Sequence, residues 1–430
     1  MSALTRSLTV AALLGCGGTK DTAAQPAVVD SGVEDVADVR VAQPGDPPVC
    51  ASEPAVTMPP APRGDHGGAL DAADRKLVLF GGDTDVAPCG GIPARKHSAE
   101  TFVLDVACGS YRPIMGANPG ARARHVMVSD VERDRAVMFS GRTRSGSTGP
   151  YQLFNDAWAF DFKTEAWSVL ATTGTAPSPR ANAAGAIDRK RSRLIVFGGN
   201  TNTAGTAFTP TDDTFALDLK TGAWTAIASA TRPTARLFHA MAVDDDGEQL
   251  YLFGGGDENA FTGPFFKDTW ALDLKTDTWK KLAPSGQIPL GRIQLGMSFD
   301  RDRKRVLVFG GHDDGKLGNE NDLYALNVAT MQWTKLGVGD SFKSASTGTC
   351  KFPADFTEID KNAPERRSAF AFAPTSDGRA FVVHGGKSDC GLLTDVHWWN
   401  DVGETFTPIT KAPAGLSCLR YSETCTSLCG

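Results

Sequence analysis

The sequence predicts an all-β fold: a six-bladed β-propeller whose blades are four-stranded antiparallel sheets. A segment of about 56 to 59 residues recurs six times, interrupted by one longer interval before the sixth copy. Within each copy, apolar and polar residues alternate with a period of two, and no stretch sustains a helical apolar stripe. Charged turns separate the four short strands of each copy, and six such units predict a ring of six blades.

Each copy begins at an arginine, which is followed by a strand of small residues, a charged turn and an aliphatic strand. We align the copies at Arg63, Arg122, Arg180, Arg236, Arg292 and Arg366. The aliphatic strand ends on a pair of glycines, placed at Gly81, Gly141, Gly198, Gly254, Gly310 and Gly385. A glycine that returns at one point of every copy indicates a positive φ or the close approach of another backbone segment.

The third strand contains aromatic residues and ends on Asp or Asn, as in the motifs DAWAFD and DTWALD. A tight turn leads to the fourth strand, which carries one large aromatic residue per copy. These residues are Tyr111, Trp167, Trp224, Trp279, Trp333 and Phe406. Large aromatics at a fixed point of each unit are expected to anchor the core.

This repeat resembles the kelch family, whose signature is a glycine pair after a hydrophobic strand, then a spaced aromatic residue and a Trp. The resemblance covers residues 61–412 and implies one kelch-type propeller. Two copies depart from the pattern. The second has Ser140 in place of the first glycine of its pair. In the sixth, the segment HWWNDVGETF departs from the aromatic spacing of the other copies.

The first residues resemble a bacterial lipoprotein signal, with one Arg, an apolar run of about eight residues and then Leu-Leu-Gly-Cys. We expect residues 1–15 to be removed and Cys16 to be lipidated, although an ordinary signal peptide is the alternative. Residues 16–60 are then a disordered tether, because they are rich in Ala, Val, Asp and Pro. These features predict a lipid-anchored, extracytoplasmic protein of the bacterial envelope, at the outer membrane or cell surface.

Eight further cysteines predict disulfides in an oxidising compartment, with reduced thiols in a cytosolic protein as the alternative. Their positions in the repeat favour one pair between Cys350 and Cys390 and another between Cys89 and Cys108. The tail, residues 413–430, reads as the start of another blade and is expected to close the ring. Cys50 would then pair with one cysteine of this tail: Cys418, Cys425 or Cys429.

The connections after the glycine pairs are long and unlike one another, and they share a face with the links between blades. Variable loops on a rigid frame are the expected binding site. Candidate binding residues on this loop face are Arg95, Arg142, Arg144, Phe261, Phe265, Arg236 and Arg292. Two alternatives stay open: the repeat arginines either grip acidic groups or bond to neighbouring carbonyls, and the loop phenylalanines either stack on a partner or plug the loop base.

The sequence favours a binding module over an enzyme, because no residues have a recognisable catalytic spacing. His66, His125 and His239 follow three repeat arginines, but they fall in different blades, so we expect neither a metal nor another cofactor. The paired acids of the loops suit calcium or solvated turns equally. A formal charge of −6 disfavours nucleic acid.

We therefore expect a monomer that binds a protein or a glycan and contacts the membrane only through its lipid anchor. Galactose oxidase contains a kelch-type propeller, but the scattered tyrosines here do not form its copper-binding set. The alternative is a propeller enzyme acting on carbohydrate, as an oxidase, epimerase or lyase, at the central channel.

Overall fold

The computed structural model describes residues 45–51, 59–85, 96–146, 148–205, 207–260, 262–313, 318–342, 357–358, 360–388 and 391–410. The expected signal peptide, the lipidation site and the closing tail lie outside these residues. So do Cys89, Cys350 and Cys390, which leaves the expected Cys350–Cys390 bond a prediction. The unit Gln43–Gly430 contains the whole propeller.

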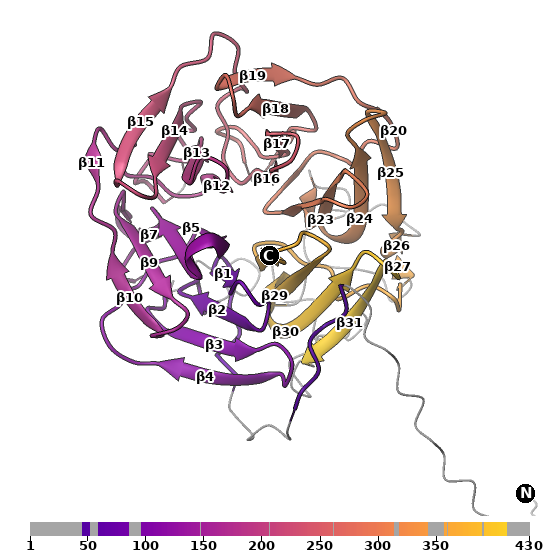
Figure 1. Ribbon diagram of the computed structural model, residues 1–430, viewed down its shortest axis with the longest axis horizontal. Coiled ribbons are helices and arrows are strands. Elements are labelled where there is room, and N and C mark those ends of the chain that lie inside the picture. The colour runs from indigo at the N-terminus through magenta and orange to yellow at the C-terminus, as the bar shows by residue number, and fades with distance from the viewer. Residues whose placement is uncertain are drawn as a thin grey trace, which may run out of the picture. The chain divides into compact units, whose positions relative to one another are not determined.

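Six antiparallel sheets stand around a central channel, which confirms the predicted all-β propeller (Figure 1). Blades one to three are β1 (Gly67–Leu70), β2 (Lys76–Phe80), β3 (Thr101–Asp105), β4 (Ser110–Ile114); β5 (Val126–Asp130), β6 (Arg135–Phe139), β9 (Ala157–Asp161), β10 (Ala166–Val169); and β12 (Ala184–Asp188), β13 (Arg193–Phe197), β14 (Thr214–Asp218), β15 (Ala223–Ile227). Blades four to six are β16 (Ala240–Asp244), β17 (Gln249–Phe253), β18 (Thr269–Asp273), β19 (Thr278–Lys281); β22 (Gly296–Asp300), β23 (Arg305–Asp313), β24 (Asn319–Asn327), β25 (Gln332–Gly337); and β28 (Ala371–Pro374), β29 (Ala380–Ser388), β30 (Gly391–Asn400), β31 (Thr405–Thr410).

Short strands and one 3-10 turn lie outside the four main strands of each blade. They are β7 (Arg142–Thr143), β8 (Gln152–Leu153), β11 (Thr173–Gly174), β20 (Ser285–Gly286), β21 (Arg292–Ile293), β26 (Ser341–Phe342), β27 (Thr357–Glu358) and the 3-10 turn Val131–Arg133. Two of them, β11 and β20, lie in the links that leave blades two and four, and each pairs in parallel with the outer strand of the following blade. These links therefore join neighbouring sheets.

The aromatic residue of each fourth strand packs against the preceding blade, as its fixed place in the repeat predicts. The Trp167 ring lies 5.0 Å from that of Phe80, and the Phe406 ring lies 5.0 Å from that of Phe309. Trp167 also donates its indole N–H to the hydroxyl of Thr101, at 2.9 Å. The core is thus a series of layers between blades, and each aromatic residue is shared by two of them.

A closed ring of backbone hydrogen bonds surrounds the channel axis. Six residues have φ between 53° and 62°, and each lies two positions after the arginine of its blade, which in blade six is Arg367: Asp65, Arg124, Asn182, Phe238, Gln294 and Ala369. The amide N–H of each donates to the carbonyl of the equivalent residue in the preceding blade, at 2.7 to 3.2 Å. Because the first residue also bonds to the sixth, this ring of hydrogen bonds is closed.

Each repeat arginine is buried and ties its own blade together. Its guanidinium donates to the carbonyl of the first residue of the glycine pair, at 2.9 to 3.2 Å. It also pairs with an acid that lies just before the third strand in blades one to four and within the longer third strand in blades five and six: Glu100, Asp156, Asp213, Asp268, Asp322 or Asp395. These bonds identify the repeat arginines as parts of the scaffold.

The sixth copy corrects our alignment by one residue. Arg367, not Arg366, donates to the carbonyl of Gly385 and pairs with Asp395. Arg366 instead lies 3.6 Å from Asp340, at the start of the long insertion before this blade. The insertion places two arginines in succession, and only their contacts distinguish them.

The glycine pairs are needed because the next link passes directly over them. The amide of Gly199 donates to the carbonyl of Arg236, at 2.9 Å, and the same bond recurs at all six seams between blades. A Cβ on Gly198, which has a φ of 65°, would lie 2.5 Å from that carbonyl oxygen. Ser140 takes this position in blade two with a φ of 69°, so one side chain is tolerated there in spite of the strained backbone.

The disulfide of the described region joins Cys50 to Cys108, so two expected pairings are wrong. Cys108 is not bonded to Cys89, and Cys50 is not bonded to the tail. The segment before Cys50 contacts blade six, where the indole N–H of Trp398 donates to the carbonyl of Gly45, at 2.7 Å. Cys50 therefore fastens this segment to blade one and strengthens the seam where the ring closes.

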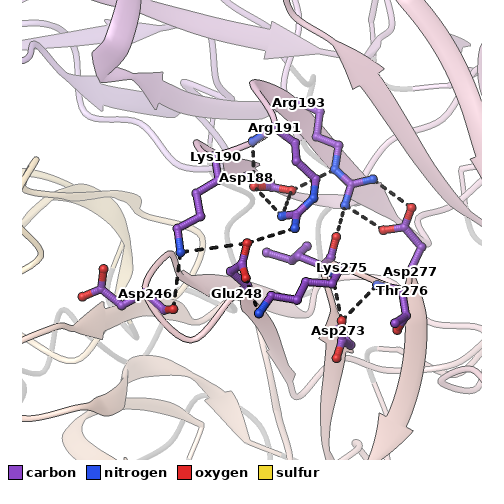
Figure 2. Close-up of polar contacts among 11 residues, drawn as sticks. Asp188, Lys190, Arg191, Arg193, Asp246, Glu248, Asp273, Lys275, Thr276 and Asp277 are labelled. Atoms are coloured by element: carbon purple, nitrogen blue, oxygen red, sulfur yellow. Dashed lines mark hydrogen bonds and ion pairs between the residues drawn. The ribbon is translucent and has the colours of Figure 1, made fainter.

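The face formed by the short turns is a network of ion pairs, as expected for scaffold. Figure 2 shows this network between blades three and four, where Arg193 donates to the carbonyl of Leu274 and pairs with Asp277, both at 2.7 Å. Glu248 accepts bonds from Arg191, at 2.9 Å, and Lys275, at 2.6 Å. Similar contacts from the start of the second strand to the following blade occur at Lys76, Arg135 and Arg305.

We expect Gly198→Ala to lower the free energy of unfolding by about 3 kcal/mol, because it adds both backbone strain and a clash with the carbonyl of Arg236. Urea unfolding followed by Trp fluorescence measures this loss. Gly120→Ala is the matched control. Gly120 also has a positive φ, 81°, but no atom lies within 4 Å of an added Cβ, so about 1 kcal/mol is expected. Equal losses would contradict the explanation by close approach.

Candidate binding site on the loop face

A charged group drawn from four blades occupies the centre of the loop face. The carboxylate of Asp65 accepts bonds from the Lys387 ammonium at 2.7 Å and the Gln294 amide at 3.2 Å. It also lies 3.2 Å from the Arg124 guanidinium. Burial alone would raise the pKa of Asp65, but the nearby charges of Arg124 and Lys387 overcome burial and hold this pKa far below its usual value.

Beside this group, Tyr151 lies between two arginine side chains. The guanidinium of Arg142 is 3.9 Å from the centre of the Tyr151 ring, and that of Arg144 is 4.3 Å from it. Both distances are within the range of cation–π contacts. The short β7–β8 ribbon supplies Arg142, while Arg144 and Tyr151 lie between its two strands, so one loop of blade two carries all three residues.

His97, from blade one, completes this cluster as a neutral ring. Burial, together with Arg142 and Arg124, lowers the pKa of His97 to about 4, although Asp83 acts in the opposite direction. Its Nδ1 accepts a hydrogen bond from the backbone N–H of Arg144, at 3.1 Å, which requires an unprotonated Nδ1. The imidazole therefore holds the loop of blade two against that of blade one.

A hollow of about 750 Å³ opens next to this cluster, between the long loops of blades one and two. Lys96, His97 and Arg144 line one part of it, and Asp85 and Gln152 also contribute. The wall carries two cations, Lys96 and Arg144, and one carboxylate, Asp85, and the Tyr151 ring packs against the Arg144 guanidinium. The arrangement suits an acidic or hydrogen-bonding group from a partner.

The structure brings together two of the predicted loop arginines, Arg142 and Arg144, of which Arg142 is buried and Arg144 is half-buried. The third, Arg95, lies outside the described residues. Phe261 also lies outside them. Phe265 is 7% exposed and packs with Leu237 and Ile293, so this phenylalanine plugs the loop base.

Arg236 and Arg292, which we expected to bind a ligand, are fully buried. Arg236 is bound to Asp268 and Arg292 to Asp322, so the repeat uses both side chains for its own bonds. The prediction of a binding role for them is therefore corrected.

Sequence reasoning missed Asp65, Arg124 and Lys387. The first two occupy the position two residues after the repeat arginine, where the backbone is the same in all blades but the residue type differs in each. That variation inside a regular repeat was the available signal, since a purely structural role would favour one residue type.

The three repeat histidines pack between blades and share no site. The rings of His125 and His239 lie 5.5 Å from Phe80 and 5.4 Å from Phe197, each in the preceding blade. The Nε2 of His66 lies 2.9 Å from Nδ1 of His384. Across the described ranges, no three His, Cys, Asp or Glu residues form a group suited to a metal.

Two of the acidic loop residues considered for calcium are bound to arginines instead. Asp213 pairs with Arg180 at 2.5 Å, and Asp212 pairs with Arg232 at 2.7 Å. The described portion of the chain also contains no helix with the length and apolar character needed to cross a membrane.

Comparison with known proteins identifies the repeat. Residues 49–231 and 189–352 match the model of the KLHDC2/KLHL20/DRC7 Kelch-repeats domain. The solved structure of YjhT is 16% identical, with a TM-score of 0.58, and the alignment covers 82% of this chain and 99% of YjhT. At this identity, the likeness to YjhT concerns the fold alone.

Three curated proteins illustrate the range of relatives. Acyl-CoA-binding domain-containing protein 4 of Arabidopsis thaliana is 28% identical over 62% of this chain and 37% of its own length. Leucine-zipper-like transcriptional regulator 1 of Homo sapiens is 26% identical over 65% and 30%. N-(sulfonatooxy)prop-2-enimidothioate sulfolyase of Thlaspi arvense is 24% identical over 63% and 72%. The chain thus spans less than half of the first two.

We expect His125→Leu to weaken the acid sensitivity of the fold. Burial first, and Arg122 next, lowers the pKa of His125 to about 3. Between pH 6.5 and 3 the unfolded chain therefore binds one more proton here than the folded chain, and stability falls by about 1.4 kcal/mol per pH unit as pH decreases. The variant should lose this slope, because Leu cannot titrate; Leu295 holds the same position in blade five.

Urea unfolding at pH 7, 6 and 5 measures the slope. His239→Leu is the companion variant, since burial also lowers the pKa of His239. It should remove a similar slope independently. Parallel stability curves for the parent and both variants would contradict the assignment of buried, neutral histidines.

Proposed function

Because this chain belongs to the KLHDC2/KLHL20/DRC7 Kelch-repeats domain family, we propose that it is a binding module whose loop face holds a protein partner. The observation that carries the proposal is the half-buried Arg144, which lies on the buried Tyr151 ring and, together with Lys96, lines the hollow between blades one and two. The scaffold beneath it is rigid, so little conformational entropy is lost when a partner binds.

The partner is expected to present acidic groups to this face. Lys96 and Arg144 line the hollow, and Arg124 and Lys387 lie nearby, where Asp65 pairs with both of them and the carboxylate of Asp83 also acts on Lys387. A guanidinium that already lies on an aromatic ring loses little freedom on pairing with a carboxylate. A glycan with acidic substituents would use the same groups, and it is the other class of partner that the test below includes.

A second candidate is catalysis on a carbohydrate at the central channel. The observation that favours catalysis is the Thlaspi arvense relative, which is named as a sulfolyase and of which this chain covers 72%. The named substrate of that relative is not a carbohydrate, so the carbohydrate substrate rests on the sequence-based expectation alone. A binding module and an enzyme differ in a simple way: an enzyme releases an altered product, whereas a binding module retains its ligand unchanged.

We further propose that the chain is exported and anchored through lipid on Cys16. The support is the lipoprotein-like start of the sequence together with the Cys50–Cys108 disulfide, because such bonds form in oxidising compartments. An anchor of this kind would leave the loop face available to partners at the envelope.

We expect Lys96→Gln combined with Arg144→Gln to weaken partner capture by about tenfold or more, because both changes remove charge from the hollow. Immobilised parent and variant proteins are compared for retention of envelope proteins and acidic glycans, at low and high salt. Lys163→Gln with Lys220→Gln is the charge-matched control, since both lysines are exposed on the turns of the opposite face. Equal loss in the control, or capture insensitive to salt, would contradict the proposal; turnover of a retained glycan would favour catalysis.

We expect the full chain, produced in a bacterial host with a labelled fatty acid, to carry the label and to sediment with membranes. Cys16→Ser should abolish both properties, because the thiol that takes the lipid is removed. Cys50→Ser is the control and should keep the label. An unlabelled parent chain would refute lipidation.

A further inference from the structure

The central channel contains a chamber of about 250 Å³. Its wall is formed by inner strands of all six blades, which contact their neighbours in a closed circle. Much of this wall is small or apolar: Gly68, Met127, Val128, Ala186, Ala242, Val243, Met297 and Phe372. Although these strands belong to the core, Val128, Val243 and Phe372 are only half-buried.

The two ends of the channel differ in construction. The closed ring of backbone hydrogen bonds surrounds the axis at the loop face. At the turn face, Arg189 of blade three bonds to blade six, which lies opposite in the ring (Figure 1). Its guanidinium donates to the carbonyl of Ser376, at 2.8 Å. The Arg189 side chain therefore spans this mouth of the chamber.

In the direct ion pairs at this mouth, two guanidinium groups meet a single carboxylate. Arg189 and Arg301 share one carboxylate, that of Asp245, at 3.4 and 2.8 Å. The other oxygen of Asp245 is buried and accepts no hydrogen bond from the described residues. Burial first, and Arg301 next, lowers the pKa of Arg189, while Asp245, Glu132 and Asp74 only partly offset these effects.

Asp74 also bonds to Ser376, the residue whose carbonyl accepts the Arg189 hydrogen bond. Its two carboxylate oxygens accept bonds from the backbone N–H and the hydroxyl of Ser376, both at 2.8 Å. Burial raises the pKa of Asp74 to about 6, so its negative charge is reduced in mildly acidic solution. Arg189 and Arg301 therefore share Asp245 as their nearest carboxylate partner at the mouth.

We propose that the chamber binds a small amphipathic carboxylate, with its apolar part among the inner strands and its carboxylate on Arg189 and Arg301. The size fits, because an apolar cavity of about 150 Å³ accommodates benzene and drug-sized ligands occupy about 300 Å³ or more. The charge also fits, since guanidinium groups bind carboxylates through paired hydrogen bonds. This site is separate from the loop face and does not depend on the function proposed for it.

When the ligand enters, Arg189 exchanges one hydrogen bond for a stronger one. Arg189 releases the neutral carbonyl of Ser376 and donates to the charged carboxylate of the ligand instead, so the Arg189 side chain no longer spans the mouth. No covalent bond is made or broken. A neutral molecule of the same shape offers no such exchange, so the chamber should select acids over alcohols.

Calorimetry on the full chain tests the proposal, with hexanoate as the probe and hexanol as its uncharged match. We expect one hexanoate site, with hexanol about tenfold or more weaker. Arg301→Gln should weaken hexanoate by a similar factor. Arg303→Gln is the control: it removes the same charge from the same turn, but Arg303 pairs with Asp401 away from the chamber wall, so affinity should not change.

A second variant tests the location independently of charge. Val243→Phe adds bulk to a half-buried wall residue and should abolish hexanoate binding while both arginines stay in place. Thermal unfolding of each variant without probe confirms that it is folded. The proposal is overturned if the parent binds no hexanoate, if hexanol binds as tightly, or if Arg303→Gln weakens binding as much as Arg301→Gln. Undiminished binding by folded Val243→Phe also overturns it.

Discussion

The closed ring of six backbone hydrogen bonds around the axis is the constraint on which the other repeated features depend. For each link to donate to the previous blade and accept from the next, one residue per blade must adopt the left-handed conformation, as Asp65 and Ala369 do. This conformation costs about 1 kcal/mol or more per non-glycine residue. It persists because the flanking bonds fix the chain on both sides: the repeat arginine holds its own blade, and the glycine pair receives the carbonyl of the next link.

This ring separates structural from functional roles at the same positions. Its requirements concern the backbone, so the side chains of its members are free to differ. Asp65 and Arg124 use that freedom to form a charged group, whereas Ala369 adds no charge. The loops add Arg142 and Tyr151 to this surface without disturbing the blades, because the glycine pair and the repeat arginine have already fixed where each loop begins.

On the opposite face, the short turns hold neighbouring blades together at their outer ends. Arg193 does so by bonding at once to its own Asp188 and to the next blade. Close to the axis, similar chemistry has another consequence. Arg189 and Arg301 converge on one Asp245 at the mouth of a chamber whose wall is in large part small or apolar. Ion pairs far from the axis therefore only join blades, whereas ion pairs close to the axis also border the chamber.

Amino-acid patterns along the chain were enough to predict the number of blades, the strand order within each blade, the anchoring aromatics such as Trp167, and the loops that carry Arg142 and Arg144. These features follow from short-range patterns, since a period of two, a turn and a glycine pair each act within a few residues. Which residues meet across the ring became known only from the folded arrangement of the six blades. The partner of Cys108, the choice of Arg367 over Arg366, and the bond from Arg189 to Ser376 all depend on closure of the six blades. Closure brings together residues that are far apart in the chain, and such contacts leave no local pattern to read.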